Sequence, residues 1–144
     1  MADRISGLLG LMRKAGALEP GMSLSEEALK KGKAKLVVVP EDISEKSRER
    51  ISFLLNGRNA VLVELPLSKQ QLSEAVGLGE CTAVTVTDLG FSDALMKLLL
   101  ETDSEKYAAA AEKIAQRLEK VKRRKVEKPG KNGEKVRRRQ NIWL

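Results

Sequence analysis

The chain has 144 residues, of which 27 are Lys or Arg, 20 are Asp or Glu, one is Cys and none is His. A single cysteine excludes a disulfide within the chain, the lack of histidine excludes every histidine-based mechanism, and together they argue against a Cys/His metal site. The length suits one domain with its own core. Since the chain has no run of about 18 apolar residues and its N-terminus is too charged for a signal peptide, we expect a cytoplasmic protein that does not bind membranes.

The N-terminal segment predicts a helix followed by a short strand. Four apolar residues at helical spacing predict one buried helix face: Ile5, Leu8, Leu9 and Met12. Gly16 is expected to end this helix. Gly7 and Gly10 each cost about 1 kcal/mol in a helix relative to Ala, so we expect them to let another element approach closely. The short strand is predicted at residues 17–19.

A second helix and a fully buried strand are predicted next. Ser23 and Glu26 have the spacing of a capping box, which predicts a helix from Ser23 to Lys31 that ends at Gly32. The apolar run Leu36–Val39 shows no alternation, which indicates a strand covered by helices on both faces. In open α/β sheets ligands bind at the carboxyl ends of the strands, so the loop after this strand is a candidate binding region.

The middle of the chain continues the alternation of helices and strands. Ser44 is expected to start a third helix, and residues 60–63 form a second buried strand. Ser68 and Gln71 form another capping box for a short helix. The β-branched residues of 82–87 predict a further strand, followed by a helix with its own apolar face: Phe91, Ala94, Leu95, Leu98 and Leu99. This order predicts the α/β class and a three-layer α/β/α sandwich.

A long C-terminal helix is predicted from a capping box at Thr102 and Glu105. It carries a narrow apolar stripe: Tyr107, Ala111, Ile114, Leu118 and Val121. Such a stripe suits packing on the domain or on a second copy of the chain. We therefore predict an α/β/α domain at 1–101, an amphipathic helix at 102–125 and a basic flexible tail at 126–144.

The positive charge of the chain gathers near its C-terminus. Residues 120–144 hold eleven Lys and Arg against two acidic residues, a net charge of +9, whereas residues 1–119 hold sixteen against eighteen, a net charge of −2. A clustered basic segment is typical of nucleic-acid binding, although a solubilising tail is the alternative. The candidate RNA contacts here are Arg123, Arg124, Lys125, Arg137, Arg138 and Arg139. Trp143 either stacks on a base or docks with Ile142 and Leu144 on the domain.

Several short blocks spread over the first hundred residues carry a family resemblance: Gly16-Ala17-Leu18, Gly21, Glu27-Ala28-Leu29, Gly32 to Val37, Glu41-Asp42, Ser68 to Leu72 and Thr87 to Phe91. Read together, they resemble the L7Ae/L30e superfamily of ribosomal and kink-turn-binding proteins, and within it the small bacterial YlxQ-like branch. The resemblance implies an α/β/α sandwich with a mixed four-stranded sheet, RNA binding and no catalysis. It implies no cofactor and no metal.

The resemblance also implies an RNA site. In kink-turn-binding members the second helix opens with Gly-x-Asn-Glu-x-x-Lys, whose side chains touch sheared G·A pairs. Gly21 matches the glycine and Met22 follows it, while Ser23, Leu24 and Glu27 occupy the Asn, Glu and Lys positions. Further contacts are implied for Lys31, Ile43, Pro66, Leu67, Ser68 and Lys69. Because the base-reading side chains differ, we expect affinity to depend strongly on salt and weakly on sequence.

Other candidate residues have two interpretations. Lys30, Lys31 and Lys33, with Lys35, form either a patch for RNA phosphates or a solvated helix end. Glu41 and Asp42 are interpreted as a solvated cap, and Cys81 as a small buried residue. The predicted function is a non-enzymatic RNA-binding protein, ribosomal or ribosome-associated. The alternative is a protein-interaction module that has lost kink-turn binding and uses the 104–121 helix either to form a homodimer or to bind a partner protein.

Overall fold

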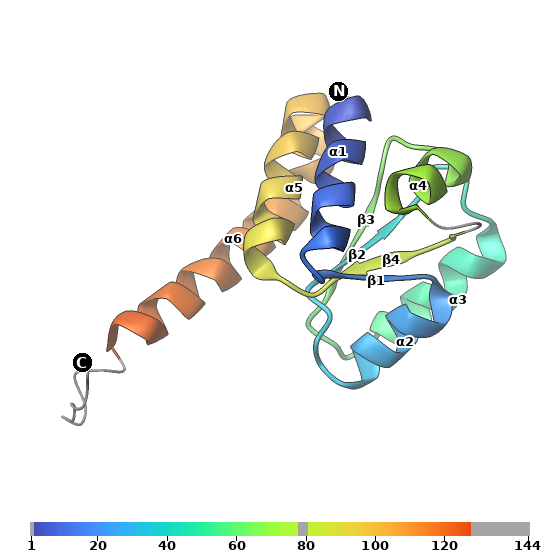
Figure 1. The fold of residues 1–144 in the computed structure, drawn as a ribbon. Helices are drawn as coiled ribbons and strands as arrows, with labels where there is room; N and C mark the ends of the chain where they lie inside the picture. Colours follow the sequence, from blue (N-terminus) through green and yellow to red (C-terminus); the bar gives the residue numbers. More distant parts are fainter. Residues whose placement is uncertain (1, 78–80, 128–144) are drawn as a thin grey trace. The chain divides into compact units, whose positions relative to one another are not determined.

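The structure is a computed structural model that describes residues 2–77 and 81–127 (Figure 1). Helices and strands alternate along it in the predicted order: α1 (Ala2–Lys14), β1 (Leu18–Pro20), α2 (Met22–Lys30), β2 (Leu36–Val39), α3 (Glu45–Leu55), β3 (Val61–Glu64), α4 (Lys69–Val76), β4 (Val84–Val86), α5 (Leu89–Thr102) and α6 (Ser104–Glu127). The chain forms two compact units, Met1–Ile114 and Ala115–Leu144, with the boundary inside α6. The division at residues 101 and 125 stays a prediction.

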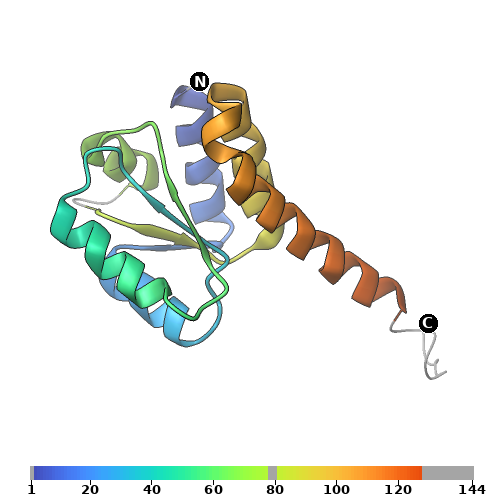
Figure 2. The same cartoon turned by 180° about the vertical axis from the view of Figure 1, so that it is seen from behind.

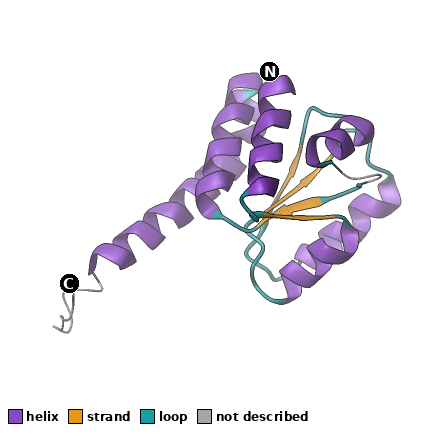
Figure 3. Ribbon diagram, in the orientation of Figure 1, coloured by secondary structure: helices purple, strands orange, loops and turns teal. Residues whose placement is uncertain are grey.

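The four strands form one mixed sheet in the order β1-β4-β2-β3 (Figure 3). β2 and β3 are parallel, while β4 is antiparallel to both β1 and β2. Val84 at the start of β4 therefore pairs with Pro20 and Val38, and Val39 pairs with Glu64. The carboxyl ends of β1, β2 and β3 consequently lie at the same edge of the sheet, which confirms the predicted mixed four-stranded sheet and defines where the loops after these strands meet.

Helices cover both faces of the sheet (Figures 1 and 2). One face packs against α1, α4, α5 and the first turns of α6, and the side chains that are fully buried there include Ile5, Leu9, Met12, Leu36, Leu72, Leu95, Met96, Leu99 and Ile114. The other face packs against α2 and α3 through Ala28, Leu29 and Ile51. Leu36–Val39 is buried along its whole length because β2 lies inside the sheet with helices on both sides. The three-layer α/β/α sandwich is confirmed.

Three predicted helix-end signals act where the sequence places them: the caps at the starts of α3 and α4, and Gly32 at the end of α2. Ser44 Oγ accepts a hydrogen bond from the Ser47 N–H at 3.1 Å and caps α3. Ser68 Oγ accepts from the Gln71 N–H at 3.1 Å, and Gln71 Oε1 accepts from the Ser68 N–H at 2.8 Å, so this capping box is complete. Gly32, with φ of 73°, ends α2 as predicted.

The capping box predicted at Ser23 and Glu26 is wrong. α2 begins one residue earlier, at Met22, and its N-cap is Gly21, for which the described residues supply no side-chain cap. Gly21 has φ of 96° and donates its N–H to the Ala83 carbonyl at 2.8 Å. This bond to a distant segment turns the chain before Ser23, which then lies inside the first turn.

The capping box predicted at Thr102 and Glu105 is also wrong, by one residue. Asp103 Oδ1 accepts a hydrogen bond from the Lys106 N–H at 3.1 Å and caps α6. Thr102 instead donates its hydroxyl to the Leu99 carbonyl at 2.7 Å, inside the last turn of α5. The cap of α6 is therefore Asp103, one position after the predicted Thr102.

α4 lies beside α1 at Gly10, whereas nothing lies close to Gly7 among the described residues. A Cβ added at Gly10 would lie 3.6 Å from the Ala75 carbonyl oxygen. A Cβ added at Gly7 would meet nothing within 4 Å among the described residues. An added Cβ would make only an ordinary van der Waals contact at Gly10, so a close approach that requires glycine is found at neither position.

Candidate nucleic-acid interface

Hydrogen bonds tie together the loops that follow β2 and β3. The Leu65 N–H donates to the Val39 carbonyl at 2.8 Å, and the Glu41 N–H donates to the Leu67 carbonyl at 2.9 Å. Asp42 Oδ1 accepts from the Lys69 N–H at 2.7 Å. Asp42 therefore caps a helix from a distant loop, a role that the sequence could not assign because it depends on the parallel pairing of β2 and β3.

The start of α2 lies at the same edge. Gly21 follows β1 directly and is bonded to Ala83 beside the start of β4. Met22 and Ile43 both pack against the core cluster under α2 and α3. We call residues 21–23, 40–43 and 65–69 the loop edge. It brings together eight of the predicted RNA contacts: Gly21, Met22, Ser23, Ile43, Pro66, Leu67, Ser68 and Lys69.

The side chains of the loop edge differ in what they can offer a ligand. Ser23 is exposed, while Met22 and Ile43 are half-buried. Leu67 is fully buried in the core, so its side chain supports the loop from below. The ionisable groups of the loop edge are the two exposed carboxylates Glu41 and Asp42 and the ammonium of Lys69, a net charge of −1. The loop edge therefore offers shape and hydrogen bonds, and little attraction for phosphate.

The remaining predicted contacts lie farther along α2, from Leu24 in its first turn to the lysines at its C-terminal end. α2 is nine residues long, which separates its ends by about 13 Å. Lys30, Lys31 and Lys33, which we call the lysine end, are exposed there. Leu24 and Glu27 line a cavity of about 360 Å³ with Lys31 and Lys33. The structure therefore divides the predicted site between two places.

Two lysines of the lysine end are paired with glutamates of the same helix. Lys31 Nζ lies 2.6 Å from Glu27 Oε1, and Lys30 Nζ lies 3.3 Å from Glu26 Oε2. The Lys31 ammonium lowers the pKa of Glu27, and the Glu27 carboxylate raises the pKa of Lys31. Glu27 thus neutralises one of the cations beside it, which weakens the lysine end as a phosphate site.

Only part of the C-terminal basic segment lies within the described residues. Arg123 is exposed on α6. Arg124 and Lys125 lie in the same helix. The contacts predicted at Arg137, Arg138 and Arg139, and the alternatives for Trp143, lie outside the described residues.

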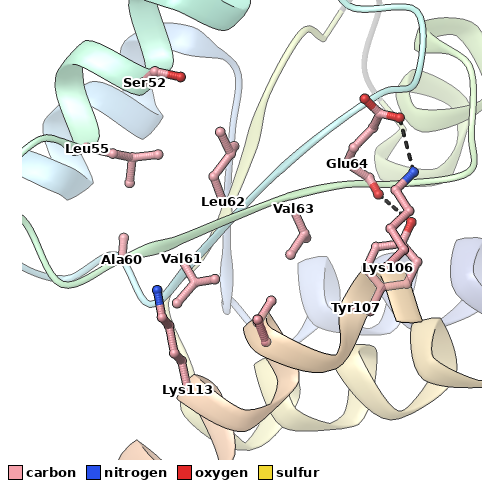
Figure 4. Close-up of a pocket in the computed structure, with 12 residues that line it drawn as sticks. Ser52, Leu55, Ala60, Val61, Leu62, Val63, Glu64, Lys106, Tyr107 and Lys113 are labelled. Carbon is pink, nitrogen blue, oxygen red and sulfur yellow. Dashed lines mark hydrogen bonds and ion pairs between the residues drawn. The ribbon is translucent and has the colours of Figure 1, made fainter. Parts of the chain in front are cut away.

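A cavity of about 560 Å³ lies between α3, β3 and the first turns of α6 (Figure 4). At one end the Glu64 carboxylate accepts hydrogen bonds from Arg48 at 2.5 Å and Lys106 at 3.2 Å, and the Glu64 carbonyl accepts from the Tyr107 hydroxyl at 2.5 Å. Burial raises the pKa of Glu64, but the hydrogen bonds from Arg48 and Lys106, with their charges, outweigh it and lower the pKa overall. We call these contacts the Glu64 clamp and assign them a structural role.

Cys81 and the acidic residues make no further site in the described part of the chain. The Cys81 side chain is buried, as predicted, and its thiol donates to the Ala83 carbonyl at 3.3 Å. Burial raises the pKa of this thiol. Residues 2–77 and 81–127 hold no group of three acidic, Cys or His side chains suited to a metal ion, and no helix there is long and apolar enough to cross a membrane.

Comparisons with known proteins point to one family. The model of the ribosomal protein L7Ae/L30e/S12e/Gadd45 family matches residues 3–96. The chain is 29% identical over 92 residues to the RNA-binding protein YlxQ of Bacillus subtilis (strain 168), covering 64% of this chain and 91% of that protein. It also resembles the solved structure of a protein with unknown function from Bacillus halodurans, with a TM-score of 0.60, 25% sequence identity, and coverage of 66% of this chain and 95% of the other. The family model ends at residue 96, within α5.

Proposed function

We propose, since the chain belongs to the ribosomal protein L7Ae/L30e/S12e/Gadd45 family, that it is a non-enzymatic RNA-binding protein of the ribosomal or ribosome-associated kind. The family match over residues 3–96 and the similarity to YlxQ confirm the resemblance seen in the sequence. YlxQ is named an RNA-binding protein, and we extend that activity to this chain. The observation that carries the proposal is the loop edge, where three separate segments of the family domain meet.

In this proposal the loop edge provides the shape that fits the RNA, and residues 120–144 provide the positive charge. The loop edge has a net charge of −1, so it cannot supply the attraction that dominates RNA affinity. Residues 120–144 carry a net charge of +9 and are the natural source of that attraction. We therefore propose that the loop edge fits the fold of a structured RNA while the basic segment, helped by the lysine end, binds phosphates.

Titration of a structured RNA at several salt concentrations tests the electrostatic part. Replacing Arg137, Arg138 and Arg139 together by Gln should weaken binding and reduce the slope of log K against log salt by up to about 2–3, because each neutralised phosphate contributes about 0.7–0.9. The matched control replaces Arg4, Lys14 and Lys97 by Gln, which removes the same charge from exposed positions on α1 and α5. Equal losses in both variants would mean that net charge matters and the basic segment does not.

A gain-of-function variant tests the base-reading part. Replacing Ser23 by Asn, Leu24 by Glu and Glu27 by Lys rebuilds the kink-turn pattern and frees Lys31 from its pair. We expect the wild type to bind a kink-turn RNA and a plain duplex about equally, and the variant to prefer the kink-turn RNA. A wild type that already prefers the kink-turn RNA would show that specificity resides in other groups of the loop edge.

The alternative function is dimerisation through residues 104–121. Tyr107, Ala111 and Ile114 are already buried in the core of the first unit, which leaves only the later part of the apolar stripe, Leu118 and Val121, for a second copy. Both side chains are half-buried within their own unit. Light scattering over a range of concentrations tests this alternative, because a mass that stays at one chain contradicts it.

A further inference from the structure

Phe53 on α3 is the most exposed large apolar side chain among the described residues, at 77%. The chain has two Phe, one Tyr and one Trp. Tyr107 is 3% exposed, and Phe91 packs partly against the main core cluster. Burying a phenyl ring stabilises a fold more than burying most other side chains. An exposed ring therefore suggests a function other than stabilising the fold.

Two cations share the exposed side of α3 with this ring. Lys46, Arg50 and Phe53 fall at i, i+4 and i+7 on the exposed side of α3, a row about 10 Å long that we call the α3 stripe. The inner side of α3 is fixed by Ile51, which is fully buried. The helical spacing of Ile51, Leu54 and Leu55 places Phe53 off the apolar face of this helix, and this is the signal in the sequence that could have found it.

Arg50 is held toward α2, which packs beside α3 (Figures 1 and 2). Its Nη2 lies 3.1 Å from Glu26 Oε1, while Lys30 Nζ lies 3.3 Å from the other oxygen of the same carboxylate. The hydrogen bonds from Arg50 and Lys30 lower the pKa of Glu26 and keep it ionised. One carboxylate therefore fixes two cations and neutralises only one of them.

Arg58 adds a further guanidinium where α3 and α2 end. Its Nε donates to the Leu54 carbonyl at 2.8 Å and its Nη1 to the Leu29 carbonyl at 3.5 Å. These bonds fix the position of the guanidinium. Because backbone carbonyls carry no net charge, they do not neutralise it. The cations of this region of α2 and α3 are Lys30, Lys46, Arg50 and Arg58, and its carboxylates are Glu26, Glu45 and Glu49, with Glu49 one turn before Phe53 on the helix; the surplus is one positive charge.

The α3 stripe continues from the loop edge. α3 begins at Glu45, two residues after Ile43, and Phe53 lies about 12 Å farther along the helix. The apolar patch is a single ring among charged groups, which is too small and too polar for the core of a protein interface. An exposed aromatic ring beside cations is the arrangement that binds unpaired nucleotides, because a base stacks on the ring while its phosphates meet the cations.

We propose that a single-stranded RNA segment leaving the loop edge follows the α3 stripe, with one base stacked on Phe53 and phosphates beside Lys46 and Arg50. This inference rests on the proposed RNA-binding function and adds a second contact surface to it. The loop edge takes the structured part of the RNA, and the α3 stripe takes the unpaired strand that continues from it.

The test compares two RNAs, a hairpin and the same hairpin with a single-stranded extension, using the full chain. Phe53→Ala should weaken binding of the extended hairpin by about fivefold or more, which is the lower end for loss of one stacked base, and leave the plain hairpin unchanged. Phe53→Tyr should keep wild-type affinity, whereas Phe53→Leu should behave like Phe53→Ala because it keeps the apolar volume and loses the stacking face. Leu11→Ala, 55% exposed on α1, is the matched control and should change nothing.

The outcomes separate this inference from the function on which it rests. A wild-type chain that binds neither RNA overturns both. Binding of both RNAs by Phe53→Ala with wild-type affinity overturns the α3 stripe alone and leaves the RNA-binding function standing. Full affinity in Phe53→Leu also overturns the stripe as a stacking surface. Arg50→Gln should lower the salt slope for the extended hairpin by about 0.7, and an unchanged slope would contradict the phosphate contact.

Discussion

Replacing Glu64 by Gln tests the Glu64 clamp with the smallest change of shape. The carboxylate is bonded to Arg48 and Lys106, and its side chain is 27% exposed. Pairs of this kind contribute about 0.5–1 kcal/mol each. Losing the charge should therefore lower the free energy of unfolding by about 1–2 kcal/mol at pH 7. The same bonds lower the pKa of Glu64 below its ordinary value of 4.5 against the opposing effect of burial.

The lowered pKa also predicts how this difference depends on pH. A carboxylate whose pKa is lower in the folded state stabilises the fold above its unfolded pKa, and the stabilisation is lost as the pH falls through the folded pKa. Urea unfolding of the wild type and Glu64→Gln should show the full difference at pH 7 and a shrinking one below pH 4.5. Glu41→Gln, which removes an exposed carboxylate, is the control. Equal midpoints at pH 7, or a difference that persists in acid, would refute the reasoning.

Three further changes have clear expected outcomes. Ser68→Ala removes half of a complete capping box, so it should cost about 1 kcal/mol in urea unfolding and speed amide exchange in α4. Gly77→Ala should destabilise by more than about 1 kcal/mol, because φ is 72° and the new Cβ would lie 2.9 Å from Arg13 Nη1, whereas Gly7→Ala, with open space in a helix, should stabilise by about 0.5–1 kcal/mol. Cys81 should react with a thiol reagent far more slowly before unfolding than after it, since burial raises its pKa.

The sequence predicts the fold well because the relevant signals are local. The unbroken apolar run at Leu36–Val39 identifies the buried strand, and Ser44 and Ser68 identify the starts of α3 and α4 within a few residues of chain. Each signal is a property of one helix end or one strand. These local signals predict the final structure because the sandwich packs helices and strands along the apolar faces that their own sequences define.

The start of α2 could not be predicted in the same way. Ser23 and Glu26 have the right spacing for a cap, yet a hydrogen bond from Gly21 to Ala83, sixty-two residues away in the chain, fixes the turn earlier. The division of the site has a similar cause. Gly21 and Lys31 are close in sequence, but they lie at opposite ends of α2. Gly21 therefore belongs to the loop edge and Lys31 does not.

The position of α6 has a consequence for how copies of this protein behave toward one another. β3 is an outer strand of the sheet, and the rim of such a strand is a template on which another polypeptide can pair. The Tyr107 hydroxyl donates a hydrogen bond to the Glu64 carbonyl, and the Lys106 ammonium places a positive charge beside the Glu64 carboxylate. The start of α6, which follows the family-matched residues 3–96, therefore protects the edge of β3 from pairing with another chain. We expect a chain shortened before α6 to aggregate more readily.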